Sequence, residues 1–132
     1  MKKIVIILAF SILPLIAVAG TDVHVEASQT TTAPNGRYEI IQSSILRRLT
    51  FRVDKANGVV SQLVKSKDGS YWWSPIERQY SSNDTVYPGN INYQMFFGGF
   101  QASDAFLINV NTGETWMVVR DKNDEIYLEL MK

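Results

Sequence analysis

Residues Thr50–Val60, TFRVDKANGVV, decide how we expect this chain to fold. Shifted by 55 residues, they lie on Ala105–Thr115, AFLINVNTGET, so that Phe51 meets Phe106. In the first segment apolar and polar residues alternate, which is the period of a half-buried β-strand. Both segments then enter a turn containing Asn and Gly, residue types that tolerate the positive φ angles of tight hairpins. The segment therefore predicts a β-hairpin that occurs twice.

The correspondence extends outward in both directions. With the same shift, residues 37–77 lie on residues 92–132 without a gap. The identical pairs are Tyr38/Tyr93, Phe51/Phe106, Gly58/Gly113, Val64/Val119 and Lys67/Lys122. The turn glycines and the apolar pattern agree together, which indicates an internal duplication. The alternative is that two unrelated β-meanders share a glycine-turn rhythm.

Each unit holds four expected strands. They cover residues 37–42, 49–54, 59–65 and 71–76 in the first unit, and 92–97, 105–110, 114–120 and 125–131 in the second. One such sheet with a single apolar face is marginal alone. We therefore predict an all-β fold of two duplicated four-stranded antiparallel meanders, packed as a sandwich or blade pair, with residues 78–91 as the linker. The expected core is Tyr38, Ile40, Leu49, Phe51, Val53, Leu63, Tyr93, Met95, Phe106, Ile108, Val118, Ile126, Leu128 and Leu130.

The N-terminus has the pattern of an export signal. Lys2 and Lys3 precede an apolar run that ends at Ala17-Val18-Ala19, with small residues where a signal peptidase needs them. The run is short for a membrane anchor, the alternative interpretation. We expect residues 1–19 to be a signal peptide and residues 20–36 a flexible lead segment. The product would be periplasmic or secreted, and would contact the membrane only through the signal peptide before cleavage.

Composition excludes several kinds of site. The chain has no cysteine, so it can form neither a disulfide nor a thiolate metal site. Its 13 basic and 13 acidic residues cancel, which argues against a nucleic-acid partner. His24 is the only histidine and lies in the lead segment, so one chain holds no serine–histidine–aspartate arrangement and no multi-histidine metal site. We expect no cofactor.

The segment 106–116 resembles a blade motif of quinoprotein-type β-propellers. That motif has an apolar pair, an Asp, two further residues, Thr-Gly and a nearby Trp. Here Asn109 replaces the Asp, Asp54 restores it in the first unit, and Trp116 follows the glycine. The resemblance covers about a dozen residues per unit and implies a blade-like four-stranded sheet; two units imply neither a whole propeller nor a bound quinone. The chain also looks like small exported bacterial proteins with a Tyr-x-Ile strand, which suggest a compartment and a fold but no activity.

Aromatic residues are the most informative candidates for binding. Trp72 and Trp73 are adjacent, so on a strand they point to opposite faces, and one ring is exposed unless both faces are covered. Exposed rings stack on sugars or anchor protein interfaces. The predicted binding patch is Trp72, Trp73, Tyr127, Phe97 and Phe100. A protein partner or self-association is favoured over a glycan.

Acidic residues offer only weak candidates. Asp121, Asn123 and Asp124 form an oxygen-rich turn that a hard cation would accept, although a polar hairpin turn is the simpler interpretation. Paired carboxylates of a glycosidase would be Asp54 with Glu77, or Asp104 with Glu129, which sequence cannot rank. The predicted function is a non-enzymatic binding or assembly module of the bacterial cell envelope. The alternatives are a small carboxylate-dependent hydrolase and an inhibitor-like module that docks on an envelope enzyme.

Overall fold

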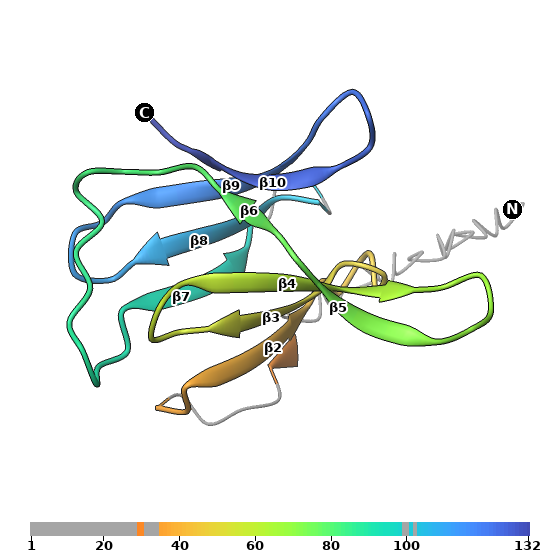
Figure 1. The fold of residues 1–132 in the computed structure, drawn as a ribbon, viewed down its shortest axis with the longest axis horizontal. Helices are drawn as coiled ribbons and strands as arrows, with labels where there is room; N and C mark the ends of the chain where they lie inside the picture. The colour runs from red at the N-terminus through yellow and green to blue at the C-terminus, as the bar shows by residue number, and fades with distance from the viewer. Residues whose placement is uncertain (1–28, 31–34, 99–100, 102) are drawn as a thin grey trace, which may run out of the picture.

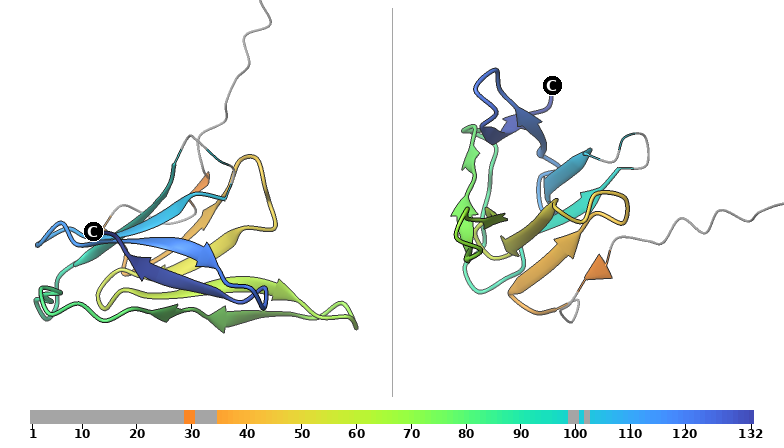
Figure 2. Two further views of the ribbon diagram at one scale, coloured as in Figure 1. Left: turned by 90° about the horizontal axis from the view of Figure 1, so that it is seen from above. Right: turned by 90° about the vertical axis from the view of Figure 1, so that its right-hand side faces the viewer.

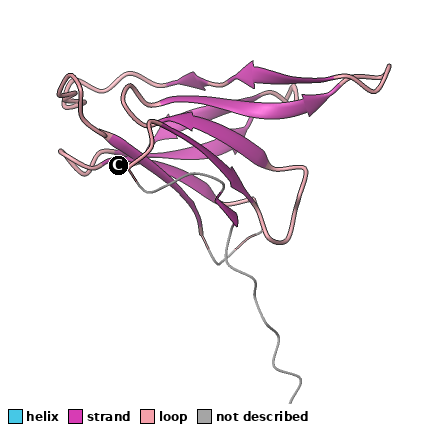
Figure 3. Ribbon diagram, turned by 90° about the horizontal axis from the view of Figure 1, so that it is seen from below, coloured by secondary structure: helices cyan, strands magenta, loops and turns pink. Residues whose placement is uncertain are grey.

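The computed structural model describes residues 29–30, 35–98, 101 and 103–132. The predicted signal peptide, residues 1–19, lies outside these residues, as does most of the lead segment. The described residues form strands, turns and loops, with no helix among them (Figure 3). That part of the chain therefore contains no helix able to span a membrane.

Two five-stranded sheets make up the structure (Figure 1). The first has the order β1-β2-β3-β4-β5, and its strands are Gln29–Thr30, Tyr38–Gln42, Thr50–Asp54, Val59–Lys65 and Tyr71–Pro75. The second has the order β6-β10-β9-β8-β7, and β6 to β10 are Glu77–Arg78, Tyr93–Phe97, Ala105–Asn109, Thr115–Arg120 and Ile126–Leu130. Each contains the predicted four-stranded antiparallel meander, and the two pack around one core. The all-β fold is confirmed.

The chain passes from one sheet to the other along a nearly continuous strand. Only Ile76 separates β5 from β6, and β6 pairs in parallel with β10 at the edge of the second sheet (Figure 2). Glu77 was expected to end the first unit and Arg78 to begin the linker. Instead these two residues pair with Tyr127 and Leu128, so they cover backbone groups that an edge strand would leave unpaired.

Strand pairing in the two sheets follows the same 55-residue offset. Ile41 pairs with Phe51 as Phe96 pairs with Phe106. The turns match as well. The N–H of Gly58 donates to the carbonyl of Asp54 and that of Gly113 to the carbonyl of Asn109, both at 2.8 Å, and each glycine has a positive φ. The Asp54 and Asn109 side chains each accept the N–H two residues further on.

The two sheets nevertheless bury opposite faces. In the first sheet Phe51 and Val53 point into the core, and Phe51 contacts the Phe97 ring with centroids 5.9 Å apart. In the second sheet their counterparts at the 55-residue offset lie on the outer side, while Leu107 between them is fully buried. The sheets are therefore stacked front to back.

This arrangement corrects the predicted core. Leu49, Phe51, Val53, Tyr93, Met95 and Leu128 are buried, and Val118, Ile126 and Leu130 pack against them, as expected. The core assignments of Tyr38, Ile40, Leu63, Phe106 and Ile108 were wrong, since Tyr38 is 49% exposed and the others are half-buried on outer faces. Their places are taken by Leu107 and Trp116, both fully buried. The error came from assuming that equivalent faces of the two units meet.

Candidate functional site

The outer face of the second sheet is apolar. Its members alternate along β7 to β10 with the residues that face the core, and they are Gln94, Phe96, Phe106, Ile108, Thr115, Met117, Val119, Tyr127 and Glu129. None of them is buried or belongs to the core cluster. Phe96 is 43% exposed and stacks on Phe106 with ring centroids 5.2 Å apart. A contiguous apolar face left open in this way is characteristic of an interaction surface.

The outer face of the first sheet combines apolar and charged side chains. Its members are Tyr38, Ile40, Gln42, Thr50, Arg52, Asp54, Val59, Ser61, Leu63, Lys65, Tyr71, Trp73 and Pro75. The Arg52 guanidinium lies over the Trp73 ring, 5.0 Å from its centroid, and Leu63 pairs with Trp73 across the strands. This geometry is a cation–π contact on a half-buried ring. The face therefore offers an aromatic platform with positive charge.

At the border of this face, Asp54 holds the first hairpin. Its carboxylate accepts two hydrogen bonds from the Arg37 guanidinium, at 3.0 and 2.8 Å, and one from the N–H of Ala56. The Arg37 side chain, followed by the Ala56 N–H, keeps the pKa of Asp54 below its ordinary value of 3.8, against the opposing effect of burial. Asp54 therefore stays ionised in mildly acidic solution.

This lowered pKa predicts acid sensitivity. A carboxylate whose pKa is depressed on folding stabilises the folded state above its unfolded pKa, and this stabilisation is lost as the pH falls through the folded value. Urea unfolding should therefore show stability decreasing below about pH 3.8, and the decrease should be shallower in Asp54→Asn. Asp68, whose pKa is lowered by the Ser70 N–H, is present in both proteins. Its contribution to the acid sensitivity is therefore the same in both, and the difference between the two profiles reports on Asp54. Identical pH profiles would show that Asp54 does not contribute.

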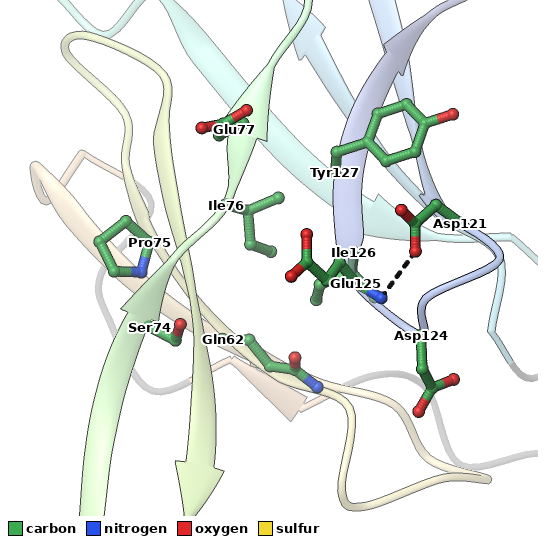
Figure 4. A pocket seen from close by; sticks show the side chains of 10 residues that line it. All are labelled: Gln62, Ser74, Pro75, Ile76, Glu77, Asp121, Asp124, Glu125, Ile126 and Tyr127. Carbon is green, nitrogen blue, oxygen red and sulfur yellow. Dashed lines mark hydrogen bonds between the residues drawn. The ribbon is translucent and has the colours of Figure 1, made fainter.

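A pocket of about 520 Å³ opens where the ends of the two sheets diverge. Its lining, drawn in Figure 4, is Gln62, Ser74, Pro75, Ile76, Glu77, Asp121, Asp124, Glu125, Ile126 and Tyr127. Two of its carboxylates are bonded to groups of the β9–β10 turn. Asp121 accepts the N–H groups of Asn123 and Glu125 at 2.8 and 2.9 Å, and Asp124 pairs with Arg120 at 2.8 Å. The pocket is acidic, and two of its four acids, Asp121 and Asp124, are bonded within the turn.

These bonds bear on the acidic candidates from the sequence. No set of three or more potential metal-ligating side chains lies together in the described ranges. Asp124 has a φ of 69°, the left-handed conformation that Gly69 adopts in the first sheet, so its position is explained by the turn. Of the carboxylates considered for hydrolysis, Asp54 is paired with Arg37, and Asp104 accepts the N–H of Gln101.

The structure does not bring the predicted aromatic residues into one patch. By strand register, Trp72 is on the core-facing side of β5 but is 48% exposed, and Trp73 is on the outer face. Tyr127 lies on the outer face of the second sheet, and Phe97 points inward and packs against the core. Phe100 lies outside the described residues.

The linker carries a buried polar cluster that sequence analysis missed. The Asp84 carboxylate accepts hydrogen bonds from the Tyr93 hydroxyl and the Asn109 amide, both at 2.7 Å, and pairs with Arg78 at 2.9 Å. The Arg78 guanidinium lies 4.8 and 4.7 Å from the ring centroids of Tyr93 and Trp116. Burial, followed by the bond to Asp84, raises the pKa of Tyr93. The cluster fixes the linker against the end of the second sheet.

The site with the clearest capacity to bind is therefore the pair of outer sheet faces. Comparisons with protein-family models, curated proteins and solved structures gave no match.

Proposed function

We propose that this chain is an exported, non-enzymatic binding or assembly module of the bacterial cell envelope, and that it binds a protein surface through the outer face of its second sheet. The observation that carries the proposal is the row formed by Phe96, Phe106 and Met117, which are cross-strand neighbours on that face. Burying apolar surface is the main driving force of protein association. The polar ends of the face, Gln94 and Glu129, give it the polar rim typical of interfaces.

Two further features support the proposal. The basic start and the small residues at Ala17 and Ala19 favour export. The 55-residue correspondence in sequence, strand register and turn bonds supports a duplicated unit. The outer face of the second sheet then corresponds to the side of the first sheet that already packs in the core. One acid of each carboxylate pair considered for hydrolysis is engaged by a neighbour, Asp54 by Arg37 and Asp104 by the N–H of Gln101, which favours a binding role over the hydrolase alternative.

Site-specific photocrosslinking in cells that export the protein tests the proposal. A photoreactive amino acid replaces Phe96 on the face, and Lys122 in the exposed β9–β10 turn is the matched control. We expect adducts of the processed chain, beginning at Gly20, from position 96 and none from position 122. Adducts of equal yield at both positions, or none at position 96, would overturn the proposal. Retention of residues 1–19 in the exported chain would overturn the signal-peptide assignment.

A further inference from the structure

We propose that copies of this chain associate head to tail, with the outer face of the second sheet of one copy packed on the outer face of the first sheet of the next. The inference rests on the proposed function and names the partner, a second copy. Such a contact is heterologous: it joins two different faces and leaves one of each free, so it continues into a ring or an open chain.

The argument comes from the front-to-back stacking inside the chain. The core-facing side of the first sheet, with Ile41, Phe51 and Val53, packs on the core-facing side of the second. At the 55-residue offset, the outer face of the second sheet is the counterpart of that first side, with Phe96, Phe106 and Ile108 in the same register. The outer face of the first sheet is likewise the counterpart of the core-facing side of the second sheet. Each chain thus exposes both halves of an interface it already forms once.

The contacts between the two sheets within one chain show which groups would meet in the contact between copies. The carbonyl of Lys55 accepts the N–H groups of Asn92 and Tyr93 at 2.8 and 2.9 Å, and the Tyr93 ring fits against Gly58, where an added Cβ would lie 2.8 Å from it. The counterparts of the ring and the glycine are Tyr38, which is 49% exposed, and Gly113, where an added Cβ would contact nothing within 4 Å.

The carbonyl of Val110 is the counterpart of the Lys55 carbonyl, and Val110 is itself 49% exposed. In the proposed contact this carbonyl accepts the N–H groups of Arg37 and Tyr38 of the next copy, and the ring of that Tyr38 lies over Gly113. Val110 and Tyr38, which would meet in this contact, are thus both exposed.

Differences between the counterparts set the strength of the contact. On the outer face of the first sheet, Gln42 and Arg52 stand where the second sheet turns Phe97 and Leu107 toward the core. Polar and charged groups lose hydration when an interface closes, which weakens association. The contact between copies is therefore reversible and depends on protein concentration.

A complementation experiment on the processed chain tests the arrangement. Met117→Lys places a charge on the outer face of the second sheet, where Glu129 is its cross-strand neighbour, and Leu63→Glu places one on the outer face of the first sheet. Sedimentation velocity is measured for the wild type, each variant and their equimolar mixture, with Lys122→Glu as the control and circular dichroism to verify folding. We expect the wild type and the control to associate with rising concentration, each variant alone to stay monomeric, and the mixture to form a dimer that goes no further.

Each other outcome decides the question. If Leu63→Glu alone still dimerises while Met117→Lys does not, the second sheet pairs with itself and the head-to-tail arrangement is wrong. A wild type that stays monomeric at millimolar concentration also overturns self-association, but leaves the proposed function standing if position 96 crosslinks to another protein. A variant that fails to fold is replaced by Val119→Lys or Ile40→Glu on the same two faces.

The converse substitution gives an independent measure. Arg52→Leu copies the residue that the second sheet buries at the corresponding position, Leu107, and should tighten the contact between copies at least tenfold. It should not change the crosslinking yield to other proteins at position 96 when the chain is dilute. An unchanged or weaker association of Arg52→Leu would mean that this face does not take part.

Discussion

Trp116→Ala should remove a large part of the stability of the fold, about 3–5 kcal/mol. The Trp116 side chain is fully buried, its ring lies 6.4 Å from that of Tyr93, and its indole Nε1–H donates to the carbonyl of Gln79 at 2.9 Å. Truncation leaves a cavity and an unpaired carbonyl in the linker. Because domains of this kind are stable by only about 5–15 kcal/mol, we expect a large shift of the urea midpoint, measured by circular dichroism.

Trp73→Ala is the matched control. The same residue type there is half-buried on the outer face, and its ring is covered by Arg52. We expect it to lose less than half of what Trp116→Ala loses, with the folded state retained in buffer. Equal losses from the two variants would contradict the front-to-back stacking, since that stacking places one ring inside the core and the other outside it.

The pattern within each strand determines whether its buried side can be predicted from the sequence. In β3, Phe51 and Val53 flank Arg52, so only one side of the strand can enter a core, and the prediction was correct. In β8 the run AFLIN is apolar on both sides, and the alternation cannot say which side is buried. The turn residues predicted where strands end because their φ requirement is local. The choice of face in the second sheet is set by tertiary packing.

The same limit applies to the candidate site. Sequence placed Trp72 and Trp73 on opposite faces, which strand geometry guarantees, but it could not tell that Phe97 points inward to contact Phe51. The pairing of β6 with β10 involves two residues and no local signal, so it depends on where the crossing strand meets the second sheet. Asp84 was equally invisible, because an acid in a polar linker gives no sign that Arg78 and Tyr93 lie beside it.

Front-to-back stacking of the two sheets also explains why residues at the 55-residue offset are seldom identical. The outer side of the first sheet, with Gln42 and Arg52, corresponds to the core-facing side of the second sheet, with Phe97 and Leu107. Of two positions that correspond in the two units, one therefore faces the core and the other faces outward, so they favour different residues. This accounts for why the strand pairing of the two units matches throughout at the 55-residue offset although few of their residues are identical.

Asp84→Ala should destabilise the protein by about 3 kcal/mol, the second largest effect we expect. Its side chain is 13% exposed, and its carboxylate contacts the Arg78 guanidinium, the Tyr93 hydroxyl and the Asn109 amide together. Removing one member of a largely buried ion pair leaves the other charge without compensation, which costs more than the pair contributes on balance. Thermal unfolding in the same buffer measures the loss.

Two companion variants separate charge from position. Asp84→Asn retains an acceptor for the Tyr93 hydroxyl but no charge for Arg78, so it should lose less than Asp84→Ala. Asp68→Ala removes an acid that is bonded only within an exposed turn, and should cost less than about 1 kcal/mol. If Asp84→Ala were as mild as Asp68→Ala, the Asp84 carboxylate would not be what fixes the linker, and the position of Arg78 beside the buried Trp116 would need another cause.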